Sequence, residues 1–345
     1  MEFDCPVPMT QYSNILLAHG SGGTMMHQLI DKVFVAAFGS PELKAGHDGA
    51  VLDVEGRIAM TTDSYVVNPL FFPGGDIGKL AIYGTCNDLA MCGARPVYLT
   101  AGFIIEEGLP METLWRIVCS MREAADETGV RIVTGDTKVV ERGKADGVFI
   151  NTAGVGFVPD ARVIAPLQVS EGDVIILNGD IGRHGIAVMA GREGLSLETA
   201  IESDAASLAG LVNDVFDAGV NVHCLRDLTR GGLAGALVEI ARSAGVEVVV
   251  NECDIPVTEP VRGACELLGL DPMHVANEGR FILFVPENDA LNCLHCMRRN
   301  SLGENARIIG RVAHRQSPGS VRLNSVVGTS RIVEMIAGQQ LPRIC

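Results

Sequence analysis

The 345-residue sequence lacks the features that mark membrane, secreted and nucleic-acid-binding proteins. No run approaches the roughly 18 apolar residues of a membrane-spanning helix, and Met1-Glu2-Phe3-Asp4 lacks the basic flank of a signal peptide. The net charge of −15 disfavours nonspecific binding to nucleic acid or to anionic membranes. Because a secretory signal is missing, we expect the ten cysteines to be reduced thiols in a cytoplasmic protein.

The sequence also lacks the two common nucleotide-binding fingerprints, the P-loop and the Rossmann motif. The segment His19-Gly20-Ser21-Gly22-Gly23 is glycine-rich and precedes a predicted helix at residues 25–37, but its spacing matches neither motif. Backbone N–H groups in such a loop bind phosphate well, with help from the helix start. A plain glycine turn before a helix explains the same residues equally well. Cys293 and Cys296 have zinc-like spacing but no accompanying second pair, which disfavours structural zinc.

What the sequence does contain is typical of a well-packed globular protein, with 47% hydrophobic and 20% charged residues. Its length exceeds what one core usually serves, and strands alternate with helices, which predicts an α/β fold with two domains. A polar stretch near residues 159–172 is the expected joint. We therefore predict domains at residues 1–160 and 161–320, followed by a mobile tail at 321–345.

One apolar predicted helix, residues 77–92, carries two polar side chains, Asn87 and Asp88. An isolated buried carboxylate is very costly, so Asp88 needs a partner or a metal ion. This makes Asp88 a strong candidate for a functional acid.

Three other aspartates of the N-terminal half lie in comparable surroundings. Asp48 is flanked by glycines, and Asp63 and Asp136 follow predicted strands at residues 57–62 and 131–134. With Asp88 they could hold a pair of Mg²⁺ ions against a nucleotide triphosphate, since Mg²⁺ prefers carboxylate and phosphate oxygens. For any single aspartate, a helix cap or a turn is the competing explanation.

Two further charged residues are candidates for chemistry. Lys138 follows Asp136 closely and could contact a phosphate, although a solvated lysine or an ion pair explains it as well. Glu278 lies between Asn277 and Gly279 before a predicted strand, where a surface turn is the alternative.

The last residue of the chain is a cysteine, Cys345, and Pro342 stiffens the segment before it. A thiol at the end of such an arm can reach a site on its own protein or on a partner. A frayed terminus with an incidental cysteine is the alternative, because chain ends are often poorly ordered.

Several of these segments together resemble the ATP-binding superfamily of aminoimidazole ribonucleotide synthetase and selenophosphate synthetase. Within it, the C-terminal residues are similar to the tail of the HypE family of hydrogenase maturation factors. The resemblance covers essentially the whole chain, and the tail combined with the aspartate segments is its most specific part. The segments are His19-Gly20-Ser21-Gly22-Gly23, Gly46-His47-Asp48-Gly49-Ala50-Val51, Thr62-Asp63-Ser64, residues 87–94, Gly135-Asp136-Thr137-Lys138, residues 227–233, Asn277-Glu278-Gly279-Arg280 and Pro342-Arg343-Ile344-Cys345.

The resemblance implies a mixed α/β protein with two PurM-like domains, whose N-terminal sheets pair across a homodimer into a barrel, with ATP between the domains. It implies ATP-dependent dehydration of a carbamoyl group on the terminal cysteine to a thiocyanate, the source of cyanide for the iron of [NiFe]-hydrogenase. The implied partners are a HypF-type carbamoyltransferase and a HypC–HypD iron scaffold complex.

The resemblance also implies a role for each candidate residue. The implied Mg²⁺ ligands are Asp48, Asp63, Asp88 and Asp136. The implied nucleotide contacts are Gly20, Ser21, Gly22, Gly23, Asn87, Thr137 and Asp227. The implied catalytic residues are Cys345 as the carrier, Lys138 for stabilising transferred charge and Glu278 as proton acceptor.

Other functions remain open on the sequence alone. Selenophosphate synthetase and thiamine-monophosphate kinase share the scaffold, but selenophosphate synthetases usually place a cysteine or selenocysteine and a lysine by the glycine loop. Here those residues are Ser21 and Thr24. A non-catalytic thiol carrier or scaffold would keep the tail without needing the aspartates.

Overall fold

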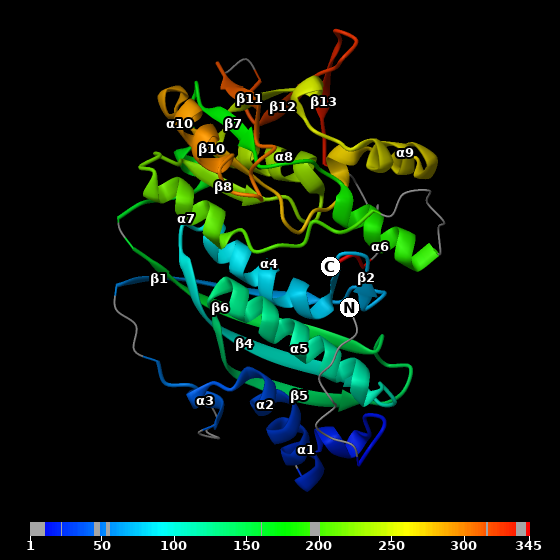
Figure 1. Ribbon diagram of the computed structural model, residues 1–345. Coiled ribbons are helices and arrows are strands. Elements are labelled where there is room, and N and C mark those ends of the chain that lie inside the picture. Colours follow the sequence, from blue (N-terminus) through cyan, green and yellow to red (C-terminus); the bar gives the residue numbers. More distant parts are fainter. Residues whose placement is uncertain are drawn as a thin grey trace.

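The computed structural model describes residues 11–21, 23–44, 49–52, 56–159, 161–193, 201–314, 317–335 and 343–345. Two mixed sheets, each with its own helices, form a first half (residues 11–159) and a second half (residues 161–335) that lie one above the other (Figure 1). This confirms the predicted mixed α/β class. No helix in the described parts of the chain is long and apolar enough to span a membrane.

In the described residues of the first half, the main sheet has four strands in the order β1-β6-β4-β5. β4 and β5 are parallel, and the other neighbours are antiparallel. The strands are β1 (Arg57–Tyr65), β4 (Arg95–Glu106), β5 (Arg131–Val140) and β6 (Val148–Val158), and a short hairpin consists of β2 (Phe71–Phe72) and β3 (Gly75–Asp76).

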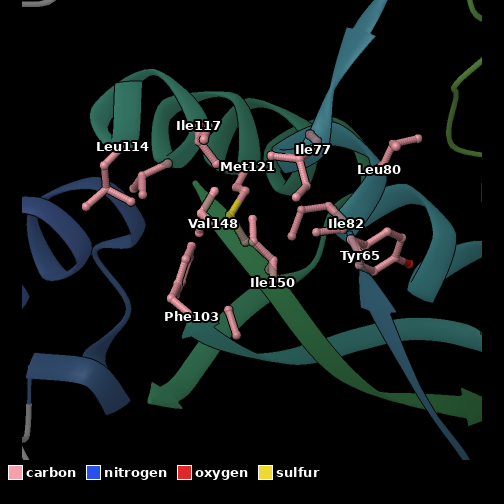
Figure 2. Packing of buried hydrophobic residues seen from close by; sticks show 14 of the residues in the cluster. Tyr65, Ile77, Leu80, Ile82, Phe103, Leu114, Ile117, Met121, Val148 and Ile150 are labelled. Atoms are coloured by element: carbon pink, nitrogen blue, oxygen red, sulfur yellow. The ribbon is translucent and has the colours of Figure 1, made fainter. Parts of the chain in front are cut away.

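One face of this sheet is covered by α4 (Ile77–Met91) and α5 (Met111–Thr128). The main core lies between the sheet and these two helices (Figure 2). Asp76 caps α4 by accepting hydrogen bonds from the backbone N–H groups of Gly78 and Lys79 at 2.7 and 3.1 Å. Gly154 of β6 allows the close approach, since a Cβ there would lie 2.8 Å from the Thr85 side chain. The polar residues of α4 are thereby brought directly over the sheet.

The N-terminal segment lies beside β5. Its residues 24–38 form one continuous helical stretch, where a helix was predicted at residues 25–37. Its elements are η1 (Leu17–Gly20), α1 (Thr24–Leu29), the π-helical η2 (Ile30–Val35), α2 (Ala36–Phe38) and the separate α3 (Pro41–Lys44).

In the described residues of the second half, seven strands form a sheet in the order β13-β12-β9-β11-β7-β10-β8. Its strands are β7 (Val174–Leu177), β8 (Cys224–Asp227), β9 (Glu247–Asn251), β10 (Phe281–Val285), β11 (Arg307–Ala313), β12 (Ser320–Asn324) and β13 (Ser330–Val333). Its helices are α6 (Arg183–Glu193), α7 (Ala209–Asp217), α8 (Gly232–Ala244), α9 (Glu259–Leu268) and α10 (Glu287–Met297), with short turns η3 (Pro166–Gln168), η4 (Glu252–Asp254) and η5 (Pro272–His274).

The second sheet extends beyond the predicted boundary at residue 320. β12 pairs in parallel with β9 and antiparallel with β13, so residues 320–333 belong to the second half and not to a tail. In the described residues, Val333 is therefore the last residue of a strand. The sequence did not predict β12 and β13, because only Val321, Leu323 and Val333 point into the core and most of the other residues in these strands are polar.

Two strands of the first sheet are also longer than predicted. β1 continues to Tyr65 and β5 to Val140, because their neighbours β6 and β4 pair with them over that full length. Asp63 and Asp136 therefore lie within strands and not in loops at strand ends. Their side chains consequently point to defined faces of the sheet.

Candidate active site

A group of four acidic residues lies where the two halves meet. We call Asp63, Asp88, Asp227 and Glu278 the carboxylate cluster, because each carboxylate acts electrostatically on the others. β1, α4, the end of β8 and the loop before β10 each supply one member. The cluster therefore forms only when both halves are folded and in contact.

Asp88 is held by a neighbour on β1. The Thr61 hydroxyl donates to Asp88 Oδ2 at 2.9 Å. Burial nevertheless raises the pKa of Asp88, the negative charge of Asp63 adds to this, and Arg226 and Arg230 oppose it. A buried, partly compensated carboxylate of this kind gains stability from any cation placed beside it.

Asp227 ends β8, and a tight turn follows it. Gly231 and Gly232 in that turn have φ values of 84° and 61°, which favour glycine. Burial, with a contribution from the Asp88 carboxylate, raises the pKa of Asp227 to about 7. The protonation of Asp227, in the second half, is therefore coupled to the protonation of Asp88 on α4.

Glu278 is 4% exposed, and burial followed by the charge of Asp227 raises its pKa well above the ordinary value. Its backbone is fixed by Asp204, whose carboxylate accepts from the N–H groups of Glu278 and Gly279 at 3.3 and 3.2 Å. A carboxyl group with a raised pKa is suited to accept a proton near neutral pH.

The terminal thiol lies next to this cluster. Cys345 is half-buried, and burial, followed by the charge of Glu278, raises the pKa of its thiol to about 12. Ile344 is 6% exposed and packs in a core that includes Val188 and Ala276 of the second half. The C-terminus therefore lies between the two halves, beside β2 (Figure 1).

Backbone hydrogen bonds hold the tail segment, Arg343–Cys345, alongside the residues that follow β1. Val66 N–H donates to a Cys345 carboxylate oxygen at 3.1 Å, and Asn68 N–H donates to the Arg343 carbonyl at 3.3 Å. Arg192 of α6 donates to the carbonyls of both Asn68 and Arg343, each at 3.0 Å. The tail segment is therefore bound by both halves at once.

Arg343 adopts an unusual backbone conformation, with φ of 42°. Its guanidinium forms an ion pair with Asp146 at 2.6 Å. A non-glycine residue in the left-handed region is strained, so these contacts offset the cost of the bend that directs Cys345 inward.

The carboxylate cluster by itself is not a finished metal site. In the portion of the chain that the structure describes, no three His, Cys, Asp or Glu side chains are arranged to hold a metal ion. Mg²⁺ usually takes one or two protein carboxylates and completes its shell with water and phosphate oxygens. Asp63, Asp88 and Asp227 suit this requirement, because they are buried or half-buried, repel one another and lack full compensation by cations.

Asp136 and Lys138 lie on the other face of the sheet. Directly paired residues share a face, and Asp63, Thr152, Ala101 and Gly135 form such a row, which puts Asp136 on the opposite, open face. Asp136 and Lys138 are about 60% exposed and form an ion pair at 2.6 Å, which lowers the pKa of Asp136.

The separation rules out one compact cluster of all the predicted aspartates in this structure. Asp136 lies three strands from Asp63, roughly 14 Å at about 4.8 Å per strand. Paired catalytic Mg²⁺ ions lie only about 4 Å apart. The structure therefore does not bring Asp136 to the other carboxylates, and Asp48 lies outside the described residues.

The glycine loop lies beside β5, the strand that carries Asp136 and Lys138. Gly20 lies against β5, where a Cβ would come within 2.5 Å of the Val139 backbone nitrogen. Ser21 and Gly23 are exposed, and Gly22 lies outside the described residues. Thr137 faces the interior and lines an apolar cavity of about 100 Å³ between β5 and the α1–α2 stretch.

The side chain of Asn87 forms hydrogen bonds with the second half of the protein. Its side-chain oxygen accepts from Leu208 N–H at 2.8 Å, and its amide donates to the carbonyls of Ala206 and Glu278 at 3.0 and 3.4 Å. The side chain thus joins α4 to the second half. Its role in nucleotide binding stays a prediction.

Sequence reasoning missed the side chains that hold the tail segment. His184 contacts Ile344, and Arg192 contacts Arg343, across more than 150 positions of sequence. Neither residue lies in a recognisable motif, because the contact depends on how the halves are placed and not on local spacing.

Both halves of the chain match known protein families. Residues 46–158 match the family "AIR synthase related protein, N-terminal domain", and residues 170–321 match "AIR synthase related protein, C-terminal domain". The two matched regions correspond closely to the two sheets with their helices.

Individual relatives are similar over nearly their full length. Carbamoyl dehydratase HypE of Azotobacter vinelandii is 51% identical over 336 residues, which covers 96% of this chain and 97% of that protein. The crystal structure of hydrogenase maturation protein HypE in complex with ATP is 46% identical, with a TM-score of 0.92, and covers 96% of this chain and 99% of that one. A HypE–HypF complex structure contains a chain 47% identical, with a TM-score of 0.79, covering 89% and 99%.

Proposed function

Because the chain belongs to the HypE family of carbamoyl dehydratases, we propose that Cys345 carries the carbamoyl group and that ATP drives its dehydration. The protein is thus an enzyme of hydrogenase maturation, in preference to the other activities found on this scaffold. The observation that carries the residue assignments is the inward position of Cys345, which is half-buried and close enough to Glu278 for that charge to raise the thiol pKa.

The proposed reaction removes one water from an S-carbamoyl group. A carboxamide oxygen is a poor leaving group, so it first attacks the γ-phosphorus of ATP and ADP departs. The C–O bond then breaks to release phosphate, and the nitrogen loses both of its protons as the C≡N bond forms. One proton ends on phosphate and one is released, so S-carbamoyl-cysteine and ATP give S-cyano-cysteine, ADP, phosphate and a proton.

Glu278 is the proposed acceptor of an amide proton. Its charge raises the pKa of Cys345, which places it near the thiol, and its own raised pKa makes its carboxylate a stronger base than that of an ordinary glutamate. The Asp204 carboxylate fixes its backbone, which limits its movement relative to the tail.

Asp63, Asp88 and Asp227 are the residues that would hold Mg²⁺, and Asp48 stays assigned to the same role on the resemblance. When bound, Mg²⁺ neutralises phosphate charge. Asp136 has no supporting contact with these carboxylates. Lys138 lies on β5 and Gly20 lies against that strand, away from these carboxylates, so the assignment of Lys138 and Gly20–Gly23 to phosphate binding rests on the resemblance alone.

The proposed partners are a HypF-type carbamoyltransferase, which loads Cys345, and a HypC–HypD iron scaffold, which receives the cyanide. HypF is supported by the relative solved in complex with it. A homodimer is supported by the open face of the first sheet, where Ile58, Met60 and Ile104 are 45–69% exposed. The nine described cysteines are free thiols, which suits the reducing cytoplasm.

Mass spectrometry of the C-terminal peptide tests the function directly. The protein is incubated with carbamoyl donor and carbamoyltransferase, then with ATP and Mg²⁺. We expect Cys345 to gain a carbamoyl group and then to lose one water only when ATP is present. A carbamoylated peptide that keeps its water while ATP is consumed would contradict the assignment.

Residues appended after Cys345 are expected to slow dehydration by up to about 10²-fold. The terminal carboxylate of the half-buried Cys345 accepts from Val66 N–H, so added residues must displace the tail segment, and small misplacements of reacting groups are costly. Single-turnover dehydration of a carbamoylated C-terminally extended protein is compared with the same extension placed before Met1. Equal rates for the two proteins would argue against an inward tail.

A further inference from the structure

A buried histidine that the proposed chemistry does not use contacts the tail segment. His184 is the second residue of α6 and is fully buried. Its Nε2 lies 2.6 Å from the Ile344 carbonyl oxygen, and its Nδ1 lies 2.8 Å from Ser203 Oγ. Phe72 of β2 packs edge-on against the ring, with centroids 5.4 Å apart. These three contacts fix the position of the His184 ring.

The hydrogen-bond directions follow from the chemistry of the partners. A carbonyl oxygen only accepts, so Nε2 carries the proton and donates to Ile344. Nδ1 then accepts from the Ser203 hydroxyl, whose oxygen in turn accepts from Ala205 N–H at 3.1 Å. Burial lowers the pKa of His184, which agrees with a neutral ring. The Ile344 carbonyl therefore sets the tautomer, and Ser203 stabilises it by donating to Nδ1.

The position of this bond matters, because Ile344 directly precedes the carrier residue. Fixing its carbonyl limits the directions in which the Cys345 side chain can point. Ser203 also adjoins Asp204, whose carboxylate holds the backbone of Glu278 and Gly279. One short segment, residues 203–205, consequently fixes both the histidine that binds the tail and the proposed proton acceptor.

We propose that His184 is a positioning residue that holds the loaded tail segment at the reaction site, with Ser203 supporting its ring through a hydrogen bond to Nδ1. This rests on the proposed function in one respect, that Cys345 carries the reacting group. The binding of the tail by His184 does not depend on which reaction follows.

The test compares His184→Leu, which fills the space without a donor, with His184→Gln, whose side-chain amide can replace Nε2–H. The first readout is the rate at which iodoacetamide alkylates Cys345 in the full-length protein. We expect leucine to raise this rate by about 10-fold, because the Ile344 carbonyl loses its buried donor, and glutamine to restore most of the protection. His295→Leu, an exposed histidine on α10, is the matched control and should have no effect.

The second readout is single-turnover dehydration of the carbamoylated protein at saturating ATP. His184→Leu should lower this rate by a factor similar to its effect on alkylation, while the Kd for ATP stays unchanged. Glutamine should rescue the rate. A structural defect would instead weaken ATP binding and would not be rescued.

A folded His184→Leu protein with wild-type alkylation would overturn the proposal, as would a glutamine variant that behaves like leucine. If the leucine variant does not fold, Ser203→Ala decides. A rise in alkylation of about 3-fold supports the proposal, and an unchanged rate overturns it. If the wild-type protein shows no ATP-dependent dehydration, the proposed function fails, but the alkylation comparison still stands.

Discussion

Replacing Glu278 with glutamine is expected to lower single-turnover dehydration by about 10²- to 10⁴-fold, the range typical of a lost general base. Glutamine keeps the shape of the side chain but cannot accept the amide proton. The backbone contacts of Glu278 with Asp204 and Asn87 do not involve its carboxylate, so we expect the fold to persist. The rate is measured on protein carbamoylated beforehand, so that loading does not obscure the chemical step.

The pH dependence provides an independent check of the same residue. A base works only when deprotonated, so the wild-type rate should fall as the pH drops through the pKa of Glu278. Because burial raises that pKa, the fall should begin at a higher pH than for an ordinary glutamate. The Glu278→Gln protein should lack this dependence. Glu266→Gln, an exposed residue of α9, is the control, and a Glu278→Gln protein as fast as this control would exclude the role.

The second large effect is expected for Asp88→Asn, which should lower ATP-dependent dehydration by about 10²- to 10³-fold. The substitution removes charge from the centre of the carboxylate cluster but leaves an oxygen to accept from Thr61. Because burial raises the pKa of Asp88, its charged form is costly in the folded state, and asparagine should not destabilise the protein.

The measurement combines thermal unfolding with titration of Mg²⁺ and ATP. We expect an unchanged or slightly higher Tm, together with weaker Mg²⁺-dependent nucleotide binding. Asp126→Asn, on the exposed side of α5, is the matched control. Normal Mg²⁺ dependence in a folded Asp88→Asn protein would remove this residue from the proposed metal site.

Much of the fold and part of the site could be predicted from the sequence. Asp88 was identifiable because a charge in an apolar helix needs compensation, and α4 does carry it into the carboxylate cluster. Asp227 was identifiable only through the resemblance, and Glu278 was a candidate for which a surface turn was the alternative. The structure brings both to Asp88 from the second half.

Other features depend on long-range geometry that local patterns do not encode. The alternation along β5 separates Asp136 from Thr137, but nothing in that strand reveals which face α5 covers. The sequence predicts that Asn87 contacts nucleotide, but no local pattern reveals that its amide also joins the halves. The contacts of His184 and Arg192 with the tail link residues that are remote in sequence, and only the folded chain shows them.

The double contact of Arg192 with Asn68 and Arg343 has a consequence for the loading step. If a carbamoyltransferase loads Cys345 as proposed, a tail held by its own enzyme should compete with that partner for the thiol, and we expect the unloaded protein to act as its own competitive inhibitor. The apparent Kd for that partner rises in proportion as the released fraction falls. We therefore expect each contact that holds the tail for the chemical step to slow recruitment of the next carbamoyl group.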